Sequence, residues 1–437
     1  MQIILLSGGS GKRLWPLSNK VHSKQFIKLF RNDKGEYESM VQRVYRQITQ
    51  AIPDARITIA TSEAQRSATL NQLGGQVNIC LEPCRRDTFP AIALAAAYLR
   101  DVQSVSPEEA VVVCPVDPYV QDSYYDAVAS LEPMILKGDA NLTLLGVTPT
   151  YPSEKYGYII PEYAAPLAPV REFREKPCTD LARQFLREGA LWNAGVFGFR
   201  LSYLLEKAHS QLSFTDYEDL LSKYDQLPAI SFDYAVAENE SSIQVKTYSG
   251  QWRDVGTWNM LTEVMEDRII GHAVMDEACL NTHVVNKLDI PILCMGLTNC
   301  VVAASSDGIL VSDKYRSGYM KPYVDKLSTQ VRFAEKSWGL FQVLDESSHC
   351  LTIKLSMRAG ARMNYHHHDL RDEVWTVVSG EAHTIINGVQ APLKAGETVS
   401  IPAGQRHTLF ADTDLEVIEI QMGDEITGDD NHMDNLN

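Results

Sequence analysis

A glycine-rich turn followed by basic residues opens the chain. The apolar run 2–6 leads directly into four small residues, and two cationic side chains come shortly afterwards. These residues are Gly8, Gly9, Ser10, Gly11, Arg13 and Lys24. Glycines let backbone N–H groups approach an anion closely, and the start of a helix adds its positive end. A turn of this kind at a strand end predicts phosphate binding in an α/β protein.

The two best-known phosphate loops do not fit this turn. A Walker loop requires G-x-x-x-x-G-K-[ST]. Here Lys12 is followed by Arg13 instead of Ser or Thr, and Leu6 stands at the position of the first glycine of the pattern. The dinucleotide pattern G-x-G-x-x-G would begin at Gly9, and its third glycine is replaced by Leu14. A tight connection between a strand and a helix would also explain the glycines alone.

The longer string around the turn is more specific. GGSGKRLWPLS at 8–18 and KQF at 24–26 resemble the signature of sugar-1-phosphate nucleotidyltransferases, in particular the mannose-1-phosphate guanylyltransferase branch. Lys12 stands where that family has Thr, and Ser23 replaces the usual Pro before Lys24. Neither change removes Arg13 or Lys24, which the resemblance implies are catalytic cations for the triphosphate.

Two aspartates are the candidate magnesium ligands. Asp117 follows a very apolar run in VVVCPVDPY, where open sheets bind ligands, although a turn-forming aspartate before Pro118 is the simpler interpretation from spacing alone. The family has L-P-x-D-H at this point, and Pro118 replaces its histidine. Asp254 in WRDVGTW matches the family's W-x-D-V-G-[ST]-W. The resemblance implies that both carboxylates hold Mg²⁺, which prefers oxygen ligands.

Two further groups of segments resemble the base and sugar sites of the family. EPCRRDTFPAIALAA at 82–96 implies nucleotide binding, and its alanine-rich part also predicts a buried helix. Arg85 and Asp87 depart from the family pattern in this segment. The matching positions are Glu82, Pro83, Arg86 and Thr88. YGYI, FREKP and WNAGVFGF imply sugar-phosphate binding through Gly157, Glu175, Lys176 and Asn193, and FDYAVAE at 232–238 matches without an assigned role.

A histidine cluster marks a second chemical site near the C-terminus. The stretch 360–380 and the glycine, proline and histidine positions after it fit both cupin motifs, G-x5-H-x-H-x4-E-x6-G and G-x5-P-x-G-x2-H. The implied metal ligands are His366, His368, Glu373 and His407. Histidines two residues apart in a strand share a face, and such a set suits a divalent transition metal such as Zn, Co, Mn or Ni.

The role of this second site stays open at this stage. The C-terminal part resembles the cupin domain of type II mannose-6-phosphate isomerase/guanylyltransferase proteins, whose pattern there is Q-x-H-H-H-R-x-E-H-W. Val374 replaces the last histidine, and the closing R-x-E-D-x-Y-G-R is absent. Isomerisation needs a base that moves a proton between adjacent carbons. The alternative is a cupin retained for metal binding, ligand binding or dimer contacts.

Composition limits the remaining classes of function. The chain has 437 residues and a formal net charge of −16, which argues against nucleic-acid binding. No apolar run approaches the roughly 18 residues that span a bilayer, and no signal peptide is recognisable, so we expect a cytoplasmic protein. The eight scattered cysteines indicate reduced thiols.

The order of apolar runs predicts three parts. Strands near 2–6, 57–61, 77–81, 110–114 and 142–147 alternate with helices such as 38–51 and 90–103, which predicts a doubly wound, Rossmann-like α/β nucleotidyltransferase domain over 1–265. Short strands follow at 282–286, 292–295, 299–304 and 308–312 in a β-rich connecting segment over 266–328. Regularly spaced strands predict an all-β cupin barrel over 329–437, with a frayed polar tail.

The predicted reaction is transfer of GMP from GTP to mannose 1-phosphate, by Mg²⁺-assisted in-line attack on the α-phosphorus, with GDP-mannose and pyrophosphate as products. Alternatives are a bifunctional enzyme whose cupin interconverts fructose 6-phosphate and mannose 6-phosphate, or a nucleotidyltransferase for another sugar 1-phosphate or another nucleotide. A regulator with an inactive transferase domain would be expected to lack Arg13, Lys24, Asp117 or Asp254, and all four are present. We expect a homo-oligomer, a dimer.

Overall fold

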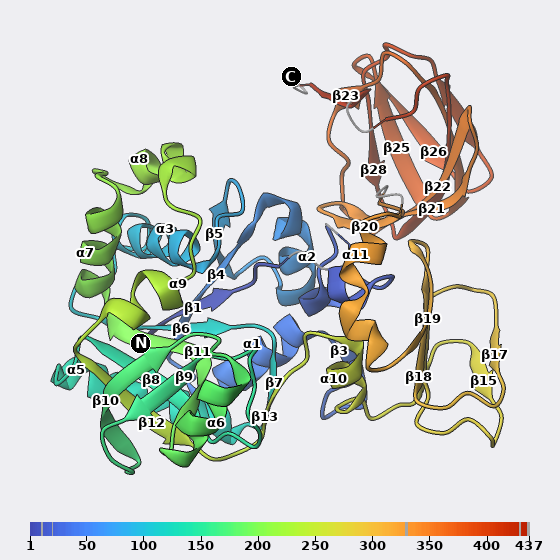
Figure 1. Ribbon diagram of the computed structural model, residues 1–437. Helices are drawn as coiled ribbons and strands as arrows, with labels where there is room; N and C mark the ends of the chain where they lie inside the picture. Colours follow the sequence, from blue (N-terminus) through green and yellow to red (C-terminus); the bar gives the residue numbers. More distant parts are fainter. Residues whose placement is uncertain (10–11, 20, 328–330, 428–429, 435–437) are drawn as a thin grey trace. The chain divides into compact units, whose positions relative to one another are not determined.

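The computed structural model describes the chain except residues 10–11, 20, 328–330, 428–429 and 435–437 (Figure 1). It divides into two compact units that each combine distant stretches of sequence. The first unit consists of Met1–Gly9, Gln25–Gly256 and Glu263–Glu266. The second consists of Ser10–Lys24, Thr257–Thr262 and Asp267–Asn437. The segment with Arg13 and Lys24 therefore belongs to the second unit, although it lies near the N-terminus in sequence.

A nine-stranded sheet forms the centre of the first unit, in the order β5-β4-β1-β6-β11-β8-β12-β10-β9. Its parallel strands are β1 (Gln2–Leu6), β4 (Arg56–Ser62), β5 (Asn78–Glu82) and β6 (Ala110–Pro115), and β12 (Ile243–Tyr248) runs parallel to β8 (Leu142–Val147). The predicted strands are confirmed. Their runs are almost entirely apolar because both faces of such a sheet are covered.

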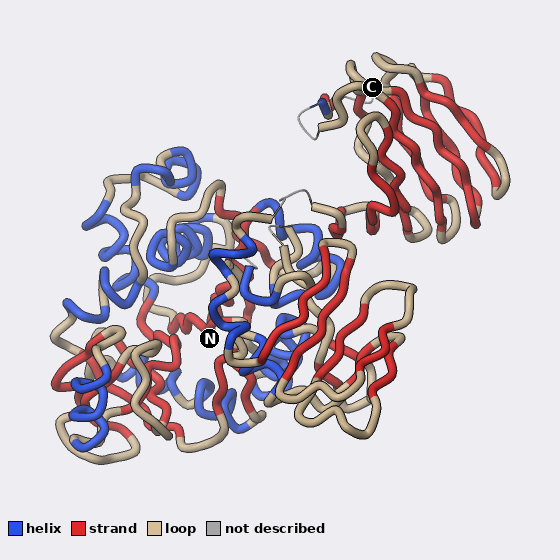
Figure 2. Tube along the Cα trace, turned by 45° about the vertical axis from the view of Figure 1, so that its right-hand side comes forward, coloured by secondary structure: helices blue, strands red, loops and turns tan. Residues whose placement is uncertain are grey.

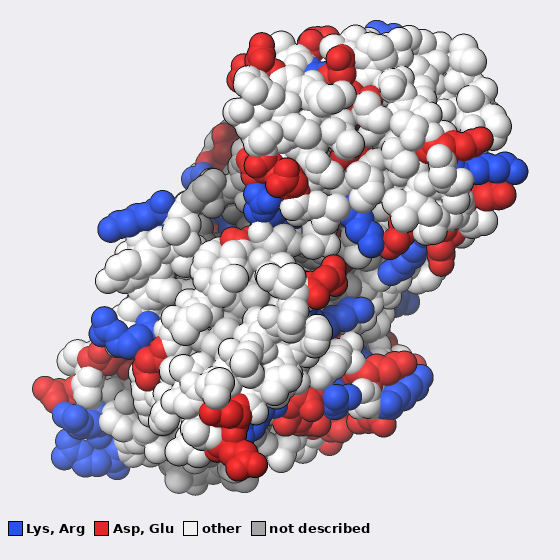
Figure 3. All heavy atoms as spheres, turned by 90° about the vertical axis from the view of Figure 1, so that its right-hand side faces the viewer, with Lys and Arg blue, Asp and Glu red and all other residues white. Residues whose placement is uncertain are grey.

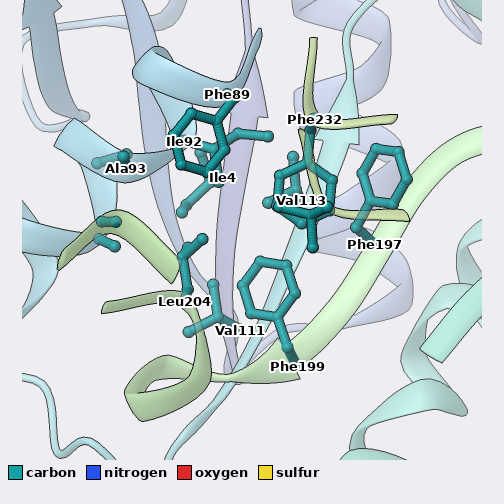
Figure 4. Close-up of a cluster of buried hydrophobic side chains, with 14 of the residues drawn as sticks. Ile4, Phe89, Ile92, Ala93, Val111, Val113, Phe197, Phe199, Leu204 and Phe232 are labelled. Carbon is teal, nitrogen blue, oxygen red and sulfur yellow. The ribbon is translucent and has the colours of Figure 1, made fainter. Parts of the chain in front are cut away.

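Helices cover both faces of this sheet. Ile3 and Ile4 point to opposite faces of β1, and both are fully buried. Helix α3 (Thr88–Asp101) packs on β1, β4 and β5, and Figure 4 shows its Phe89 and Ile92 close to Ile4. The other longer helices are α1 (Met40–Ala51), α2 (Glu63–Leu73), α4 (Ser123–Ala129), α5 (Leu131–Lys137), α6 (Thr179–Arg187) and α7 (Leu201–Gln211). The two helices that the sequence predicts correspond to α1 and α3.

Antiparallel strands extend the parallel core, and the sequence patterns did not predict them. They are β9 (Tyr158–Pro161), β10 (Leu167–Arg174) and β11 (Leu191–Arg200). A separate two-stranded sheet joins β7 (Pro118–Val120) to β13 (Trp252–Asp254). Strands of three residues leave too short an alternation to be recognised in a sequence, and their pairing depends on distant residues.

The connecting segment forms small sheets in the second unit. Strands β14 (Ile269–Ile270), β16 (His283–Asn286), β18 (Cys300–Ser305) and β19 (Gly308–Asp313) make one sheet, and β15 (Ala273–Met275) pairs with β17 (Ile292–Cys294). The four predicted runs are confirmed. Helix α10 (Trp258–Thr262) and the short turns η1 (Lys12–Leu14) and η5 (Arg316–Tyr319) belong to the same unit.

The C-terminal part of the second unit is the predicted barrel, whose strands are drawn in red in Figure 2. One sheet has the order β20-β21-β22-β29-β24-β27, and the other β26-β25-β28-β23-β30. Their bounds are β20 (Phe333–Lys336), β21 (Gly339–Glu346), β22 (Cys350–Met357), β23 (His366–His367), β24 (Asp372–Ser379), β25 (Glu381–Ile386), β26 (Val389–Lys394), β27 (Thr398–Ile401), β28 (His407–Ala411), β29 (Leu415–Met422) and β30 (His432–Met433). Trp375 is fully buried between the sheets.

The expectation of a frayed tail is wrong for the described residues 430–434. Strand β30 pairs with β23, and Asp430 is only 4% exposed. The carboxylate of Asp430 accepts hydrogen bonds from the backbone N–H groups of Asp369 and Leu370. The polar composition predicted solvent exposure, and residues 431–433 are indeed exposed, but Asp430 is buried and hydrogen-bonded to the barrel.

Candidate active site and barrel metal cluster

Three predicted nucleotide-site segments of the first unit lie along one edge of its sheet. Gly8 and Gly9 follow β1, Glu82 ends β5, and Asp117 follows β6. Because these strands are parallel neighbours through β4, their carboxyl ends share an edge, which is where open α/β sheets bind ligands. Gly9 has a φ of 150°, a conformation that favours glycine. The predicted residues Ser10 and Gly11 lie outside the described residues.

The two predicted magnesium ligands are brought together by the short sheet of β7 and β13. Asp254 pairs directly with Pro118, the residue after Asp117, in antiparallel register. Directly opposed residues in such a pair have Cα atoms about 4.5–5.5 Å apart. Gly256 leaves space for the carboxylate of Asp254, since a Cβ there would lie 2.9 Å from its Oδ1. The two aspartates are thus close along the backbone, and carboxylate oxygens are the donors that suit Mg²⁺.

The residues predicted to hold the base have structural partners in this state. Tyr224 donates its hydroxyl to Glu82 Oε2 at 2.7 Å. Burial raises the pKa of Glu82, and the hydrogen bond from Tyr224 offsets only part of this increase. Arg86 Nε donates to the carbonyl of Leu227, and Thr88 Oγ1 accepts the N–H of Phe232. These contacts fix the start of α3 at the site edge, next to Pro83.

Three of the four predicted sugar-site residues meet at the ends of β9, β10 and β11. Asn193 donates its backbone N–H to the carbonyl of Gly157, and a Cβ on Gly157 would lie only 2.4 Å from Glu175 Oε2. Lys176 follows with a φ of 44° and donates its Nζ to Glu175 at 2.5 Å. Although burial disfavours the charged amine, the hydrogen bond to Glu175 raises the pKa of Lys176.

Asp233 is a site residue that the sequence interpretation did not assign. Asn193 Nδ2 donates to Asp233 Oδ1 at 2.7 Å, so Asp233 orients the amide of Asn193. Burial and the neighbouring carboxylate of Glu175 raise the pKa of Asp233 to about 7. Glu238 accepts the backbone N–H of Glu175 from the same segment. The motif FDYAVAE carried the signal, because both acids fall within it.

The second unit holds the predicted triphosphate cations. We call residues 12–19 and 21–24 the signature segment. Arg13 is exposed in η1, and Lys24 is half-buried at the start of η2 (Lys24–Phe26). The chain then enters the first unit, where Gln25 Nε2 donates to the carbonyl of Ser7 at the end of β1. Ser7, shortly before the signature segment, and Gln25, directly after it, are therefore hydrogen-bonded to each other.

The predicted cupin ligands converge in the barrel. The nitrogen ligand atoms of His366, His368 and His407 lie within 4.8 Å of one another. Glu373 Oε1 is 2.9 Å from His368 Nε2, and its Oε2 is 3.3 Å from His407 Nε2. All four side chains are buried, between 1% and 6% exposed. The structure thus joins three strands, β23, β24 and β28, and the loop after β23 around one small volume.

Backbone carbonyls orient all three imidazoles. His366 Nδ1 lies 2.7 Å from the carbonyl of Asn364, His368 Nδ1 2.6 Å from that of Asp430, and His407 Nδ1 2.8 Å from that of Gln405. A carbonyl accepts only, so each Nδ1 carries the proton and each Nε2 presents a lone pair inward. Metal-binding histidines are held in this tautomer by the same kind of outer contact.

The electrostatics of the cluster favour a cation. His407 Nε2 lies 3.3 Å from Glu373 Oε2, and burial lowers the pKa of His366 to about 4. Burial opposes ionisation of Glu373, yet the neighbouring imidazoles of His368 and His407 hold its pKa below the ordinary value. Inward lone pairs beside an ionised carboxylate fit a divalent metal, which these four residues could bind.

A cavity of about 620 Å³ lies beside this cluster. His366, His368 and Glu373 contribute to its wall, together with apolar residues such as Trp338 and Phe341. Arg371, Lys336, Glu419 and Gln421 add polar groups. Burial and the neighbouring Glu373 raise the pKa of Glu419. The barrel therefore combines a metal-type ligand set with room for a small polar molecule.

On the face drawn in Figure 3, acidic and basic side chains are interspersed and form no continuous basic surface. Among the helices that the structure describes, none combines the length and the apolar character needed for a bilayer crossing.

Comparison with known proteins agrees with this division. The model of the nucleotidyl transferase family matches residues 2–269, so the chain belongs to that family. The model described as mannose-6-phosphate isomerase C-terminal matches residues 325–434, which contain the barrel.

Full-length relatives carry both parts. A mannose-1-phosphate guanylyltransferase of Salmonella muenchen is 31% identical, with 98% of this chain and 96% of the relative aligned. The xanthan biosynthesis protein XanB of Xanthomonas campestris is 30% identical over the same shares. A solved structure from Thermus thermophilus, described as a mannose-1-phosphate geranyltransferase, has a TM-score of 0.62 and 28% identity, covering 74% of this chain and 98% of its own.

Proposed function

We propose that this chain transfers GMP from GTP to mannose 1-phosphate and releases GDP-mannose and pyrophosphate. The observation that carries the proposal is the pairing of Asp254 with Pro118, the residue after Asp117, because Asp117 follows β6 at the edge where open sheets bind ligands. Relatives aligned over almost the whole chain carry the name mannose-1-phosphate guanylyltransferase. We place the reaction in the cytoplasm and expect a homodimer.

The proposed reaction is an in-line displacement at the α-phosphorus. The phosphate oxygen of mannose 1-phosphate attacks, and pyrophosphate leaves. Asp117 and Asp254 would hold Mg²⁺, which would supply positive charge to the phosphates, and Arg13 and Lys24 bind the triphosphate. Gly8 and Gly9 allow the backbone to approach the nucleotide, while Glu82, Pro83, Arg86 and Thr88 line the base side.

The cluster at the end of β10 is the proposed sugar-phosphate site. Asn193 and Glu175 bind sugar hydroxyls, Lys176 binds the phosphate, and Gly157 leaves the space that Glu175 occupies. Asp233 keeps Asn193 in its hydroxyl-binding orientation. This arrangement fixes the attacking group relative to the nucleotide, which is the main contribution that a phosphoryl-transfer enzyme can make.

A pyrophosphate-release assay with each of the four NTPs and a panel of sugar 1-phosphates tests the proposal. We expect turnover with GTP and mannose 1-phosphate to exceed that of other pairs. Asp254→Asn should remove it, whereas Glu263→Gln, a change at an exposed acid that pairs with Arg253, should not. Preference for another pair would overturn the specificity, and full activity of Asp254→Asn would overturn the metal assignment.

A second function is proposed for the barrel: it binds a divalent transition metal and interconverts fructose 6-phosphate and mannose 6-phosphate. The observation in its favour is the oriented cluster of His366, His368, Glu373 and His407 beside the cavity. Conversion of mannose 6-phosphate by the metal-supplied protein is the test. Metal binding without conversion would leave a ligand-binding or structural barrel.

A further inference from the structure

Residues of the connecting segment and the barrel hold the signature segment in place. Asn19 lies in the signature segment, five residues before Lys24. Its Nδ2 donates to Asp307 Oδ2 at 2.7 Å and to the carbonyl of Phe333 at 3.0 Å. Its Oδ1 accepts the N–H groups of Val21 and His22 at 2.9 and 2.7 Å. These four bonds use the full hydrogen-bonding capacity of the amide.

The pattern of partners fixes the orientation of this amide. A carboxylate and a carbonyl face Nδ2, and both can only accept. Two backbone N–H groups face Oδ1, and both can only donate. The bonds to Val21 and His22 bend the chain immediately before Lys24, in the way that asparagine side chains stabilise turns. The bonds to Asp307 and Phe333 hold that turn against the residue before β19 and the first residue of β20.

Asp307 is itself held in place. Its Oδ1 accepts the backbone N–H of Arg332 at 2.9 Å, and its own N–H donates to Ser305 Oγ at 3.1 Å. Ser305 Oγ in turn donates to the carbonyl of Pro16 at 2.7 Å. A second connection between the signature segment and the connecting segment therefore lies beside the first, and both pass through the turn between β18 and β19.

Aromatic packing adds a third, independent contact. Gly308 has a φ of 144°, and a Cβ there would lie 2.5 Å from Trp15 Cζ2, so the indole of Trp15 lies against this glycine. The fully buried Trp258 donates its Nε1 to the carbonyl of Trp15 at 3.1 Å. Polar and apolar contacts thus converge on residues 15–19, shortly after Arg13.

We propose that Asn19 and Asp307 are positioning residues for the transferase reaction, through which the connecting segment fixes the turn that carries Lys24. The inference rests on the proposed role of Lys24 and goes beyond it. It makes residues outside the family-matched part, Asp307 above all, necessary for nucleotide transfer. Neither side chain needs to touch a substrate, because their effect is exerted through the backbone of the signature segment.

An exchange of the pair tests this inference in the full-length protein. Asn19→Asp places two carboxylates opposite each other and should lower kcat/KM for GTP by about 10- to 100-fold, as expected when a catalytic group moves by about 1 Å. The double variant Asn19→Asp, Asp307→Asn restores one donor and one acceptor between the two side chains. It should recover most of the loss, although the bond to Phe333 is not restored.

The pair Asn299 and Asp313 provides the matched control. Asn299 Nδ2 donates to Asp313 Oδ2 at 2.8 Å, and both residues make their other side-chain hydrogen bonds within the connecting segment. Asn299→Asp should lower the thermal midpoint as much as Asn19→Asp, with KM and kcat of the folded enzyme unchanged. A merely structural role for Asn19 would give this same result at position 19.

Each outcome decides between the possibilities. Loss of kcat/KM in Asn19→Asp, recovery in the double variant and no loss in Asn299→Asp support the inference. Parent-like kinetics of Asn19→Asp, or a double variant no better than the single one, overturn it. If Asn19→Asp does not fold, Asp307→Asn carries the test, because it keeps one acceptor for Arg332. An inactive parent protein would instead overturn the proposed function itself.

Discussion

The two candidate metal sites are built in opposite ways. In the barrel, three histidines and one glutamate come from strands and loops close in sequence, and a backbone carbonyl orients each imidazole. In the first unit, Asp117 and Asp254 come from distant segments, and the pairing of β7 with β13 brings Asp254 opposite the neighbour of Asp117. The barrel cluster is thus oriented by backbone contacts within the barrel, whereas the proposed transferase site depends on the pairing of two short strands.

This difference indicates how each site should respond to change. A preformed cluster of buried lone pairs gains binding energy for a metal without reorganisation. Two half-buried carboxylates at a sheet edge are expected to bind Mg²⁺ more weakly and to need substrate phosphates to complete the site, which is usual for this ion. Changes in the barrel should therefore alter metal content, and changes at the sheet edge should alter turnover.

The largest effect is expected from Asp254→Ala. It removes one of two proposed Mg²⁺ ligands and with it charge stabilisation in the transition state, so kcat should fall by about 10²–10³-fold. Pyrophosphate release measures the loss, and the barrel's metal content, determined by elemental analysis, should stay at the parental value. Near-normal turnover of Asp254→Ala would contradict the proposal that changes at the sheet edge alter turnover.

Lys24→Ala should have a somewhat smaller effect on the same reaction. The change removes one cation at the triphosphate while the metal remains, and we expect a loss of about 10²-fold in kcat/KM for GTP. The exposed Lys28 offers a control, since Lys28→Ala removes a nearby lysine and leaves Lys24 in place, and should retain activity. Equal kinetics of the two variants would contradict the role of Lys24.

His366→Ala sharpens the comparison from the other side. Loss of one oriented ligand should weaken metal binding by the barrel at least about 10- to 100-fold and abolish any mannose 6-phosphate conversion, with GMP transfer nearly intact. His383, which pairs with Asp412, is the control barrel histidine. If His366→Ala stopped GMP transfer while the protein remained folded, the two sites would not be independent.

The smallest effect concerns stability against pH. Burial, with a contribution from nearby Lys287 or Lys314, lowers the pKa values of His22 and His283 to about 4. The unfolded chain then binds more protons than the folded one between pH 6.5 and 4, so the free energy of unfolding falls as the pH decreases through that window. The contribution of His22 is at most about 3 kcal/mol.

Thermal unfolding between pH 7 and 4 measures this effect. The transition of the second unit should shift to lower temperature as the pH falls, and His22→Gln should reduce the slope. His272→Gln, at an exposed histidine of the connecting segment in the same unit, should leave the slope unchanged. An unaltered slope in His22→Gln would show that His22 does not titrate as its burial implies.

The sequence predicted the elements whose pattern is local. The apolar run 110–114 and the alanine-rich run 90–98 could be assigned because continuous burial leaves a continuous signal. The cluster of His366, His368, Glu373 and His407 could be predicted because the spacing of the two cupin motifs reflects the strands and loop that carry them. Asp117 and Asp254 required a family resemblance, since nothing in their own neighbourhoods distinguishes them from aspartates in turns.

The sequence did not reveal what depends on tertiary contacts. Asp233 was passed over because its importance comes from Asn193, a residue on another element. The tail was expected to fray, yet the carbonyl of Asp430 orients His368. In both cases a polar residue that resembles surface sequence is used by a distant partner, and no periodicity reports such a use.

The anchoring of the signature segment has a consequence for how the protein is made. Asn19 leaves the ribosome 288 residues before its partner Asp307 and 314 residues before Phe333. At synthesis rates of about 5–20 residues per second, this corresponds to roughly 15–60 s during which the segment lacks its final contacts. On the proposed role of these contacts, a chain that ends before residue 307 would lack both of these partners of Asn19 and would not hold Lys24 in place.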